Sequence, residues 1–389
     1  MKARTHSHQR LTLFQIPRLL CWPALVVLLI ACSKDSKPQK SSAPARELVY
    51  TDSQFQPLSL TNVSILCDDL QECPFQEIRE GAAGPDGRTY LAGQPADLIE
   101  FDSESRRVRV IGGVGSGPGE YRLIGPIEVD ENGTLTILDL VGFRVVTFGP
   151  DGRHLNTKLM KPPQGFPHNI RLRDGRLFTL LIPPAASLDD TVQARFVEIT
   201  DETMISTAVT VQTRARVLAG SSGAPLNPFF AALPLWDVDE ELGMIFSGAA
   251  DYRIDRLRAD GTLDYSIRID VAPLPVTDAD IQAEITARLG KPPVPPEIRQ
   301  SVIERSKAAP TRHPALQDIR IFGDLLFVKR TSRTDTGRWD VFELATGTPW
   351  GMFELSSTAQ LLDADSTRVL ISDLTEEGVP FAVWYRIVR

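Results

Sequence analysis

The residues that most often perform catalysis are few in this sequence and do not combine in familiar spacings. Behind residue 32 there are three histidines, His154, His168 and His313, and no His-x-x-x-His or Glu-x-x-His pattern includes any of them. Compact zinc sites usually show such a pattern. The Gly-x-Ser-x-Gly turn of the serine hydrolases is absent as well. We therefore predict no catalytic residue. His168, ahead of an expected inner strand, and His313, just after a helical stretch, are the candidate ligand-binding residues.

Carboxylates are abundant and gather in three runs. Paired carboxylates can bind Ca²⁺ or carry out acid–base catalysis. These runs fall between expected strands, where acidic residues more often form solvated turns, so we predict turns. The runs contain Asp237, Asp239, Glu240 and Glu241, then Asp189 and Asp190, then Asp363 and Asp365.

The composition of the 389 residues is that of an ordinary globular protein, with 42% apolar and 24% charged residues. These values exclude collagen, wholesale disorder and a polytopic membrane protein. The chain carries 42 Lys and Arg against 50 Asp and Glu, a formal charge of −8. Because there is no basic excess to attract phosphate groups, we expect no nucleic-acid partner.

The first residues are typical of an export signal. Four basic residues and no acid precede the apolar run Leu19–Ala31, whose thirteen residues are too few to cross a bilayer. The end of this run and the residue after it, Leu29-Ile30-Ala31-Cys32, resemble the bacterial lipobox. That resemblance implies a lipoprotein signal peptide over residues 1–31 and a lipid on Cys32. The Ser33 that follows implies sorting to the outer membrane. A plain signal peptide or an uncleaved anchor is the alternative.

Residues 32–46 contain no large apolar side chain and are predicted to form a flexible tether between the lipid and the folded body. Loss of the four bases in the signal changes the formal charge from −8 to −12. An acidic body is not attracted to anionic lipid, so we expect the lipid to provide the membrane attachment.

Two cysteines remain in the body, Cys67 and Cys73. An even pair in an exported protein favours a disulfide, here with a short loop that contributes about 2 kcal/mol. A metal site is the alternative. It would need more ligands, and the neighbouring acids Asp68, Asp69 and Glu72 are not joined by a histidine.

The body, residues 47–389, repeats short β-rich segments separated by tight turns. Five Asp-Gly or Asn-Gly pairs suit hairpin turns, which require positive φ. The glycines of the first blades, Gly87, Gly133 and Gly175, are spaced by 46 and 42 residues. Four-stranded units at such a period are typical of a β-propeller. We count six units and predict an all-β, six-bladed propeller. The five glycines are Gly87, Gly133, Gly152, Gly175 and Gly261.

The last unit has only three good strands, and residues 47–66 contain strand-forming sequence that belongs to no complete unit. We therefore expect this N-terminal segment to supply the missing outer strand of the last blade. Closure of this kind removes the open edges that a ring would otherwise expose.

One stretch also resembles a known family. The residues that carry the likeness are Gly115 to Tyr121, Asn132-Gly133, Asp139, Arg144, Phe148 and Asp151-Gly152. They are similar to the NHL-type six-bladed propellers, a group with many exported bacterial lipoproteins of unknown role. The likeness covers one blade well and a second weakly. The glycines also suggest a phosphate loop, but no Gly-Lys-Ser/Thr follows them, so we favour a connection between blades.

Residues 272–312 interrupt the β pattern between blades 4 and 5. Thr277 and Asp280 fit a capping box, and Ile281, Ile285 and Leu289 follow at helical spacing up to Gly290. A second short helix is expected from about residue 297. The helical insertion is either a lid over one mouth of the ring or a decoration packed on a blade edge.

The resulting hypothesis is a non-catalytic binding or scaffold protein in the cell envelope, anchored by lipid at Cys32. Its partner is expected to be an envelope protein, a peptide or a glycan, and no cofactor is predicted. The alternative is a propeller enzyme of the lyase or lactonase type with a metal ion, for example Ca²⁺, in the central channel. Such sites take single residues from several blades, which a linear scan does not reveal.

Overall fold

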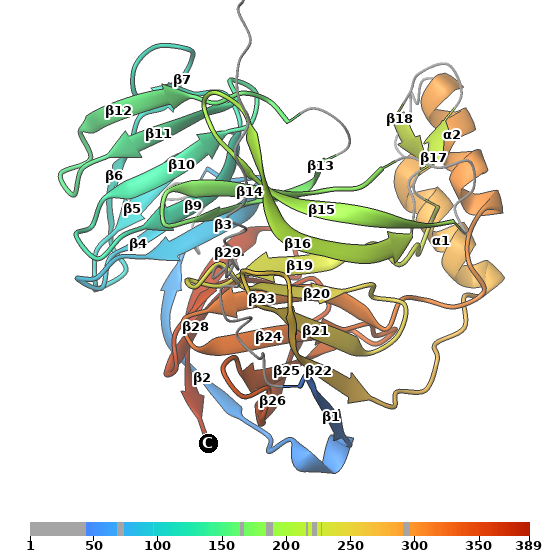
Figure 1. Ribbon diagram of the computed structural model, residues 1–389. Coiled ribbons are helices and arrows are strands. Elements are labelled where there is room, and N and C mark those ends of the chain that lie inside the picture. The colour runs from blue at the N-terminus through green and yellow to red at the C-terminus, as the bar shows by residue number, and fades with distance from the viewer. Residues whose placement is uncertain are drawn as a thin grey trace, which may run out of the picture. The chain divides into compact units, whose positions relative to one another are not determined.

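The computed structural model describes residues 44–67, 74–95, 97–163, 167–183, 190–214, 217–219, 224–226, 228–290 and 296–389. The expected signal peptide, the lipidation site Cys32 and Cys73 lie outside these residues. The described chain forms a six-bladed β-propeller, in which each blade is an antiparallel sheet and the blades follow one another in sequence (Figure 1). The all-β fold class and the six units expected from the sequence are confirmed.

The strands are as follows. Blade 1 contains β3 (Glu77–Ala83), β4 (Thr89–Gln94), β5 (Leu98–Phe101) and β6 (Arg107–Val110). Blade 2 contains β9 (Ile124–Val129), β10 (Leu135–Asp139), β11 (Arg144–Phe148) and β12 (His154–Leu159). Blade 3 contains β13 (Pro167–Arg173), β14 (Arg176–Leu181), β15 (Thr191–Ile199) and β16 (Met204–Arg214). Blade 4 contains β19 (Leu235–Val238), β20 (Met244–Ser247), β21 (Arg253–Leu257) and β22 (Leu263–Ile269). Blade 5 contains β23 (Leu316–Phe322), β24 (Leu325–Arg330), β25 (Thr336–Glu343) and β26 (Pro349–Ser356). Blade 6 contains β27 (Gln360–Ala364), β28 (Arg368–Leu374), β29 (Pro380–Val388) and β2 (Ser59–Leu66).

Short elements complete the chain outside the blades. They are β1 (Arg46–Tyr50), the 3₁₀ turn η1 (Asp52–Gln54), the parallel pair β7 (Gly113–Val114) and β8 (Glu120–Tyr121), and the hairpin of β17 (Val217–Ala219) and β18 (Ala224–Leu226).

All five Asp-Gly and Asn-Gly glycines adopt positive φ, as the turn prediction requires. In four of the turns only the glycine does so, and its N–H donates to the carbonyl three residues earlier, for example from Gly133 to Asp130. Asp174-Gly175 is the exception, because both residues have positive φ. This pair forms the two-residue hairpin between β13 and β14, whereas the other turns are one residue longer.

The first strand of each blade faces the ring axis. β3 contacts both β9 and β27, and the contacts continue through β13, β19 and β23. The first strands all run in the same direction along the ring axis. The turns after them therefore lie on one face, which we call the turn face, and the connections between blades lie on the opposite connection face.

Closure of the ring follows the prediction for β2. This strand pairs antiparallel with β29, from Ser59 opposite Val388 to Leu66 opposite Ala382, and so becomes the outer strand of blade 6. The indole N–H of Trp384 in β29 then donates to the hydroxyl of Thr89 in blade 1, at 2.9 Å. Blade 6 is thereby fastened both to the N-terminal segment and to blade 1.

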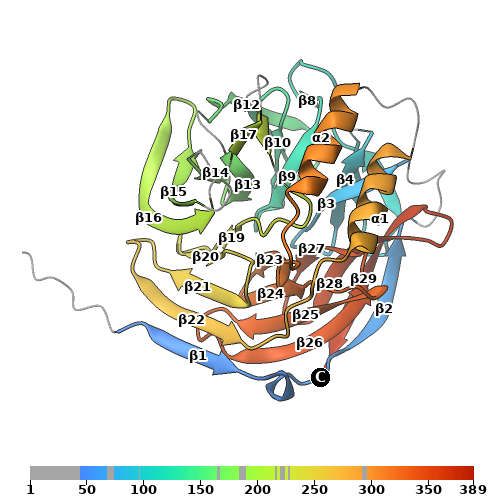
Figure 2. The ribbon, with the colours of Figure 1, turned by 90° about the vertical axis from the view of Figure 1, so that its right-hand side faces the viewer.

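The earlier part of the same N-terminal segment pairs with a blade that the sequence analysis did not predict. β1 pairs in parallel with β22, so blade 4 has five strands. Between β1 and β2, Leu58 N–H donates to the carbonyl of Met352 in blade 5, at 2.7 Å. Residues 46–66 therefore form an N-terminal belt along the outer strands of blades 4, 5 and 6 (Figure 2). The expectation that the whole segment serves blade 6 holds only for β2.

A buried ionic cluster holds the belt on blade 5. Asp340 is completely buried and accepts hydrogen bonds from Arg330, Arg338 and the hydroxyl of Tyr252. Phe55 of the belt lies against both guanidinium groups, 6.0 and 5.3 Å from its ring centroid, and is 5% exposed. Such cation–π contacts add to the burial of the ring itself.

The glycine-rich stretch that resembles a phosphate loop holds an arginine instead. Arg144 of blade 2 donates to the carbonyls of Ser116, Gly115 and Glu120, at 2.6, 3.0 and 2.8 Å. Its Nε lies 3.1 Å from the buried carboxylate of Asp139. The stretch lies between β6 and β9 and its carbonyls bind a cation, so it is a connection between blades 1 and 2, as favoured from the sequence.

Two helices form the insertion between blades 4 and 5, α1 (Asp278–Leu289) and α2 (Pro296–Lys307). The capping box is confirmed, since the carboxylate of Asp280 accepts from Thr277 N at 2.7 Å and Thr277 Oγ1 accepts in return. Gly290 is the C-terminal cap, but with φ of −69° and not the left-handed conformation. The helices stand over the connection face of the ring (Figures 1 and 2).

Candidate functional site

The inner strands enclose a cavity of about 830 Å³ around the ring axis. This volume is within the range of small-molecule sites. Every inner strand contributes to its wall, and residues of α1 and α2 do not. The lining also includes turn-face residues, so the cavity opens on the face opposite the helices. The charged lining residues are Glu80, Glu128, Asp130, Glu131, Arg171, Arg173, Asp174, Asp237, Glu240, Arg320 and Asp363.

Bulges in the inner strands help to set the direction of these side chains. The register shifts between Ile78 and Glu80 in β3, between Leu316 and Asp318 in β23, and between Leu361 and Asp363 in β27. A bulge places an extra residue in one strand and redirects the side chain beside it. In each of these strands a charged residue directly follows the bulge.

Carboxylates of the even-numbered blades fasten each one to the next blade. In blade 2, Glu128 accepts from the N–H groups of Asp174 and Gly175 in blade 3, at 2.8 and 2.9 Å. In blade 4, Asp237 accepts from Ile321 N in blade 5, at 2.8 Å. Blade 6 repeats this arrangement.

There, Asp363 accepts from Ala83 N in blade 1, at 2.6 Å, and from its neighbour Ala364 N. The prediction that the acidic runs are solvated turns is therefore wrong for the first members of two runs. Asp237 is 4% exposed, as is Asp239, and Asp363 lines the cavity. Only the later residues of these two runs, such as Glu241 and Asp365, reach the turns. Asp189, the first member of the other run, lies outside the described residues.

The odd-numbered blades direct charges toward the axis instead. Glu80 comes from blade 1, Arg171 from blade 3, and Asp318 with Arg320 from blade 5. Arg320 Nε donates to Asp318 on its own strand, at 3.1 Å. Arg171 Nε lies 3.5 Å from Asp237, is buried and makes no hydrogen bond.

Three of the charged side chains near the axis have donors or acceptors that are not used in hydrogen bonds to the described residues. Within the described residues, no hydrogen bond reaches the carboxylate of Glu80, the guanidinium of Arg171, or the terminal nitrogens of Arg320. Polar groups in such confined positions usually have partners. Within the described residues, the site thus has the Glu80 acceptor and the unused donors of Arg171 and Arg320, and Nε of Arg173 in the same lining is a further buried donor without a hydrogen bond.

The confined position shifts the pKa values of these groups. Removal from bulk water raises the pKa of the Glu80 carboxyl, although the charges of Arg320 and Arg171 oppose the shift. Burial lowers the pKa of Arg171, and the like charge of Arg320 lowers it further. The negative charge of its neighbour Asp318 instead raises the pKa of Arg320. Burial raises the pKa of Asp363 to about 6, against the hydrogen bonds from Ala83 and Ala364.

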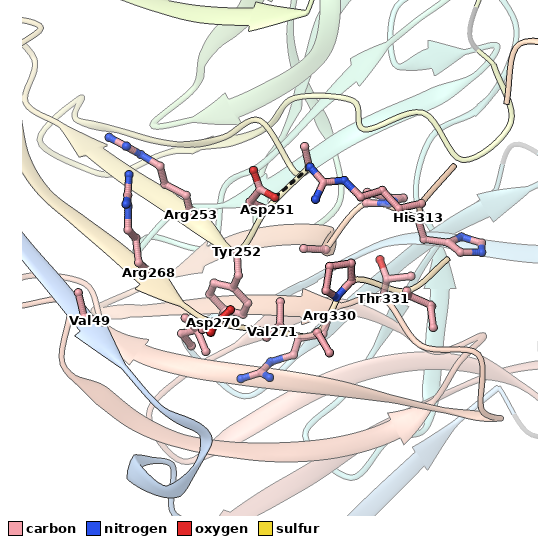
Figure 3. A pocket seen from close by; sticks show the side chains of 18 of the residues that line it. Val49, Asp251, Tyr252, Arg253, Arg268, Asp270, Val271, His313, Arg330 and Thr331 are labelled. Atoms are coloured by element: carbon pink, nitrogen blue, oxygen red, sulfur yellow. Dashed lines mark ion pairs between the residues drawn. The ribbon is translucent and has the colours of Figure 1, made fainter. Parts of the chain in front are cut away.

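A second cavity, of about 710 Å³, lies between blades 4 and 5 and is bordered by β1 (Figure 3). Its arginines already have acidic partners. Arg312 pairs with Asp251 at 3.2 Å, and Arg268 pairs with Glu47 of β1, also at 3.2 Å. Because these charges are compensated, the second cavity offers less free binding capacity than the axial one.

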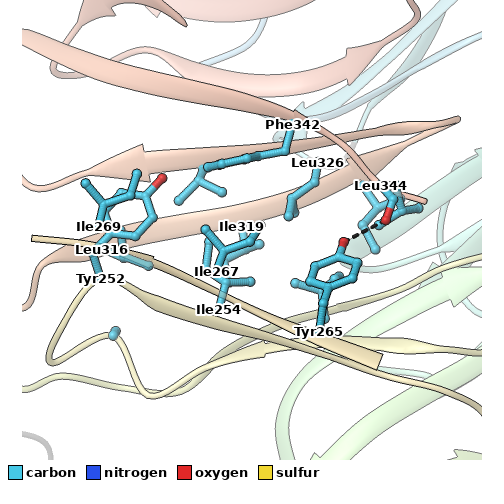
Figure 4. Close-up of a cluster of buried hydrophobic side chains, with 14 of the residues drawn as sticks. Tyr252, Ile254, Tyr265, Ile267, Ile269, Leu316, Ile319, Leu326, Phe342 and Leu344 are labelled. Atoms are coloured by element: carbon cyan, nitrogen blue, oxygen red, sulfur yellow. Dashed lines mark hydrogen bonds between the residues drawn. The ribbon is translucent and has the colours of Figure 1, made fainter. Parts of the chain in front are cut away.

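The wall of this second cavity is the apolar core between blades 4 and 5 (Figure 4). Tyr252 and Ile269 belong to both, and Ile254, Ile267 and Phe342 continue the core inward. The hydroxyl of Tyr265 donates to the carbonyl of Leu344 at 2.6 Å, which ties blade 4 to blade 5. The second cavity is thus built on a rigid, fully packed junction.

The two candidate histidines occupy structural positions. His168 is 6% exposed, and its Nε2 lies 2.6 Å from the carbonyl of Pro234, next to blade 4. It does not line the axial cavity. His313 lines the second cavity, where its Nε2 lies 3.3 Å from Asp280 of α1 and its ring packs on Phe230.

Cys67 is buried and has φ of 62°. Since Cys73 and Cys32 lie outside the described residues, the disulfide and the lipid stay predictions. Among the described side chains, no three from His, Cys, Asp and Glu come together as a metal site would require. No helix in the described part has the length and apolar character of a membrane span.

The residues that matter most in the axial cavity were not singled out from the sequence. Glu80, Arg171 and Arg320 share their strands with other charged residues, such as Arg79, Arg173 and Asp318, so the sequence does not distinguish them. The usable signal is a charge near the end of a blade's first strand, as in the sequences LWDV, LQDIRIF and QLLDA. Three blades share it.

Comparison with known proteins adds support for the fold. No family model and no curated protein matches this chain, so the NHL-type assignment stays a prediction. Among solved structures, a member of the DUF4221 family from Bacteroides vulgatus has a TM-score of 0.51 at 10% identity. The match covers 86% of this chain and 99% of that one. That likeness concerns the fold alone.

Two further solved structures have lower TM-scores. A Bacteroides fragilis protein whose name gives it as exported has a TM-score of 0.44 at 13% identity, over 88% of this chain and all of that one. An inactivated virginiamycin B lyase from Staphylococcus aureus, crystallised with quinupristin, has a TM-score of 0.40 at 10% identity. It covers 84% of this chain and 98% of that one.

Proposed function

We propose that this chain is a non-catalytic binding protein of the bacterial cell envelope. It takes a polar, charged ligand, such as a peptide, a glycan or a segment of an envelope protein, into the axial cavity. One observation carries the proposal. All six blades converge on a cavity of ligand size in which, within the described residues, no hydrogen bond reaches the Glu80 carboxylate, the Arg171 guanidinium or the terminal nitrogens of Arg320. Unsatisfied, confined polar groups favour occupancy by a molecule that satisfies them.

Binding is favoured over catalysis by the way the other candidate groups are used. Asp237 and Asp363 accept backbone hydrogen bonds that join neighbouring blades. His168 and His313 are engaged by Pro234 and Asp280. General acid–base catalysis needs a group free to exchange a proton with the substrate. Glu80 is one of several cavity carboxylates that make no hydrogen bond within the described residues, and no histidine or cysteine lines the described part of the cavity beside them.

The envelope location rests on the sequence before the belt. The lipobox-like residues end at Cys32, and a tether of residues 32–46 leads into β1. Lipidation would hold the propeller at a membrane, and Ser33 favours the outer one. In Cys32→Ala, the protein should move from the membrane fraction to the soluble fraction, and a radiolabelled fatty acid should no longer be incorporated. Unchanged labelling of the variant would contradict the anchor.

Ligand entry into the cavity is tested by photo-crosslinking in intact cells. Benzoylphenylalanine in place of Phe322, which lines the cavity, is compared with the same residue in place of Leu155, which is 60% exposed on the outer strand of blade 2. We expect a discrete adduct at position 322 alone, detected as an added mass on the peptide that contains it. Absence of an adduct at 322, or equal adducts at both positions, would contradict the proposal.

A further inference from the structure

The free groups of the axial cavity define the chemistry of a ligand more narrowly. Arg171 is fixed on one side by the ring of Trp236, 5.8 Å from its guanidinium carbon, and by Asp237 on the other. Its Nε is nevertheless buried without a hydrogen bond, and none reaches its other N–H groups within the described residues. A guanidinium that is held in place with unused donors is suited to bind a planar carboxylate through two parallel hydrogen bonds.

Arg320 offers a second, similar donor. Only its Nε is used, by Asp318, so the two terminal nitrogens remain available. Glu80, Arg171 and Arg320 line the same cavity, from blades 1, 3 and 5. The charges of the two arginines oppose the upward shift of the Glu80 pKa, as expected for groups that share this space. An oxyanion there would relieve the repulsion between the two like charges.

Charge balance excludes a highly charged anion. The two free arginines are accompanied by Glu80, Asp237 and Asp318. The cavity wall toward the turn face adds Asp130, Glu131, Asp174 and Glu240. A phosphate-rich ligand would be repelled by this wall, whereas a positive group would be attracted. The ligand that matches has a carboxylate and a cation close together.

We propose that the axial cavity binds a zwitterionic α-amino carboxylate, a free amino acid or a short peptide. Its carboxylate lies between Arg171 and Arg320, and its ammonium group donates to Glu80. This inference rests on the proposed function, because it names the ligand class of the same cavity. Each end of the ligand then satisfies a group that the protein leaves without a partner, and the net charge of the site does not change.

The test is isothermal titration calorimetry on the full-length chain purified in detergent. L-alanine and L-alanyl-L-alanine are the zwitterionic probes, and they distinguish a free amino acid from a peptide. L-alanine methyl ester lacks the carboxylate, N-acetyl-L-alanine lacks the ammonium group, and inorganic phosphate is a simple anion. We expect at least one zwitterionic probe to bind, and each blocked derivative and phosphate to bind at least tenfold more weakly.

Glu80→Gln and Arg171→Gln should each weaken the zwitterionic probe at least tenfold. The matched control is Arg176→Gln on β14, whose side chain pairs with Glu198 outside the cavity, and it should bind as the unmodified protein does. Glu80 makes no hydrogen bond, so Glu80→Gln should fold normally, and unchanged thermal unfolding checks this. The blocked probes need no variant at all.

Phosphate binding as tight as either zwitterion, equal binding of the blocked derivatives, or unchanged affinity in Glu80→Gln would overturn the inference. Absence of heat with every probe would overturn it too. If an adduct is still found at position 322 in that case, the cavity binds a ligand of another class and the proposed function stands. If no adduct is found either, both proposals fail.

Discussion

Asp237 contributes both to the stability of the ring and to the position of a charged side chain in the axial cavity. Its carboxylate accepts from Val238 N at 2.9 Å and from Ile321 N at 2.8 Å, and it is the nearest acid to Arg171. Asp237→Ala leaves both N–H groups and a confined guanidinium without their partner. Loss of one member of a buried charged pair costs about 3–5 kcal/mol. We expect a decrease of that size in the free energy of unfolding.

Asp237→Asn removes the negative charge but nearly keeps the shape of the side chain, so it distinguishes the effect of the charge from that of the packing. The amide keeps one oxygen acceptor, so one of the two backbone hydrogen bonds can persist, and we expect a loss of about 1–3 kcal/mol. The assay is equilibrium unfolding in urea, followed by the fluorescence of the tryptophans. The buried Trp236 next to Asp237 makes that signal sensitive to this junction.

The control for both variants is Glu241→Ala. This side chain belongs to the same acidic run but is 88% exposed, 3.8 Å from Arg256, and its removal should change stability by less than about 0.5 kcal/mol. A loss below about 1 kcal/mol for Asp237→Ala, or equal losses for Asp237→Ala and Glu241→Ala, would refute the role given to the carboxylate.

Three other perturbations test separate parts of the structure. Phe55→Ala removes a buried aromatic ring from the belt and should cost about 3–5 kcal/mol, with faster hydrogen exchange over residues 46–58, whereas Val49→Ala, at a 67% exposed position, should not. Because the folded pKa of Asp363 is about 6, above its ordinary 3.8, its protonated form stabilises the fold; that contribution is complete below about pH 4, falls between pH 4 and 6, and is absent above. The difference in stability between the unmodified protein and Asp363→Asn should therefore change by up to about 3 kcal/mol across this window, and a constant difference would contradict the shift. For Cys67 and Cys73, mass spectrometry of the unreduced protein should find their peptides linked, and free thiols at both would contradict the disulfide.

Much of the ring could be predicted from the sequence because propeller blades are local structures. Several hairpins are encoded by alternating strands and a turn with its glycine, as at Asn132-Gly133. The closing strand β2 could be inferred because blade 6 lacks an outer strand. The position of β1 could not be inferred. Nothing in the five residues of β1 specifies β22 as a partner, since parallel pairing across the ring depends on where the blades lie.

The cavity was hidden from sequence analysis for a related reason. Glu80, Arg171 and Arg320 are separated by many residues and meet only because their blades stand around one axis. Each also sits at a polar position of an alternating strand, which solvent exposure explains equally well. Asp237 and Asp363 were misread because a turn acid follows closely after each of them, Glu241 or Asp365.

The measurement that bears most directly on this account is a covalent test of ring closure. Thr61 in β2 and Arg386 in β29 are exposed residues directly opposite each other, so Thr61→Cys with Arg386→Cys should form a disulfide under mild oxidation. We expect a monomer of altered electrophoretic mobility that is stabilised by several kcal/mol, because the closed loop is long. The loss of chain entropy in the unfolded state corresponds to a stabilisation of about 6 kcal/mol. Thr61→Cys combined with Leu155→Cys, which lies on blade 2, should not cross-link. If the first pair stays reduced, or cross-links no faster than the second, the chain ends do not meet, and the axial cavity does not exist as described.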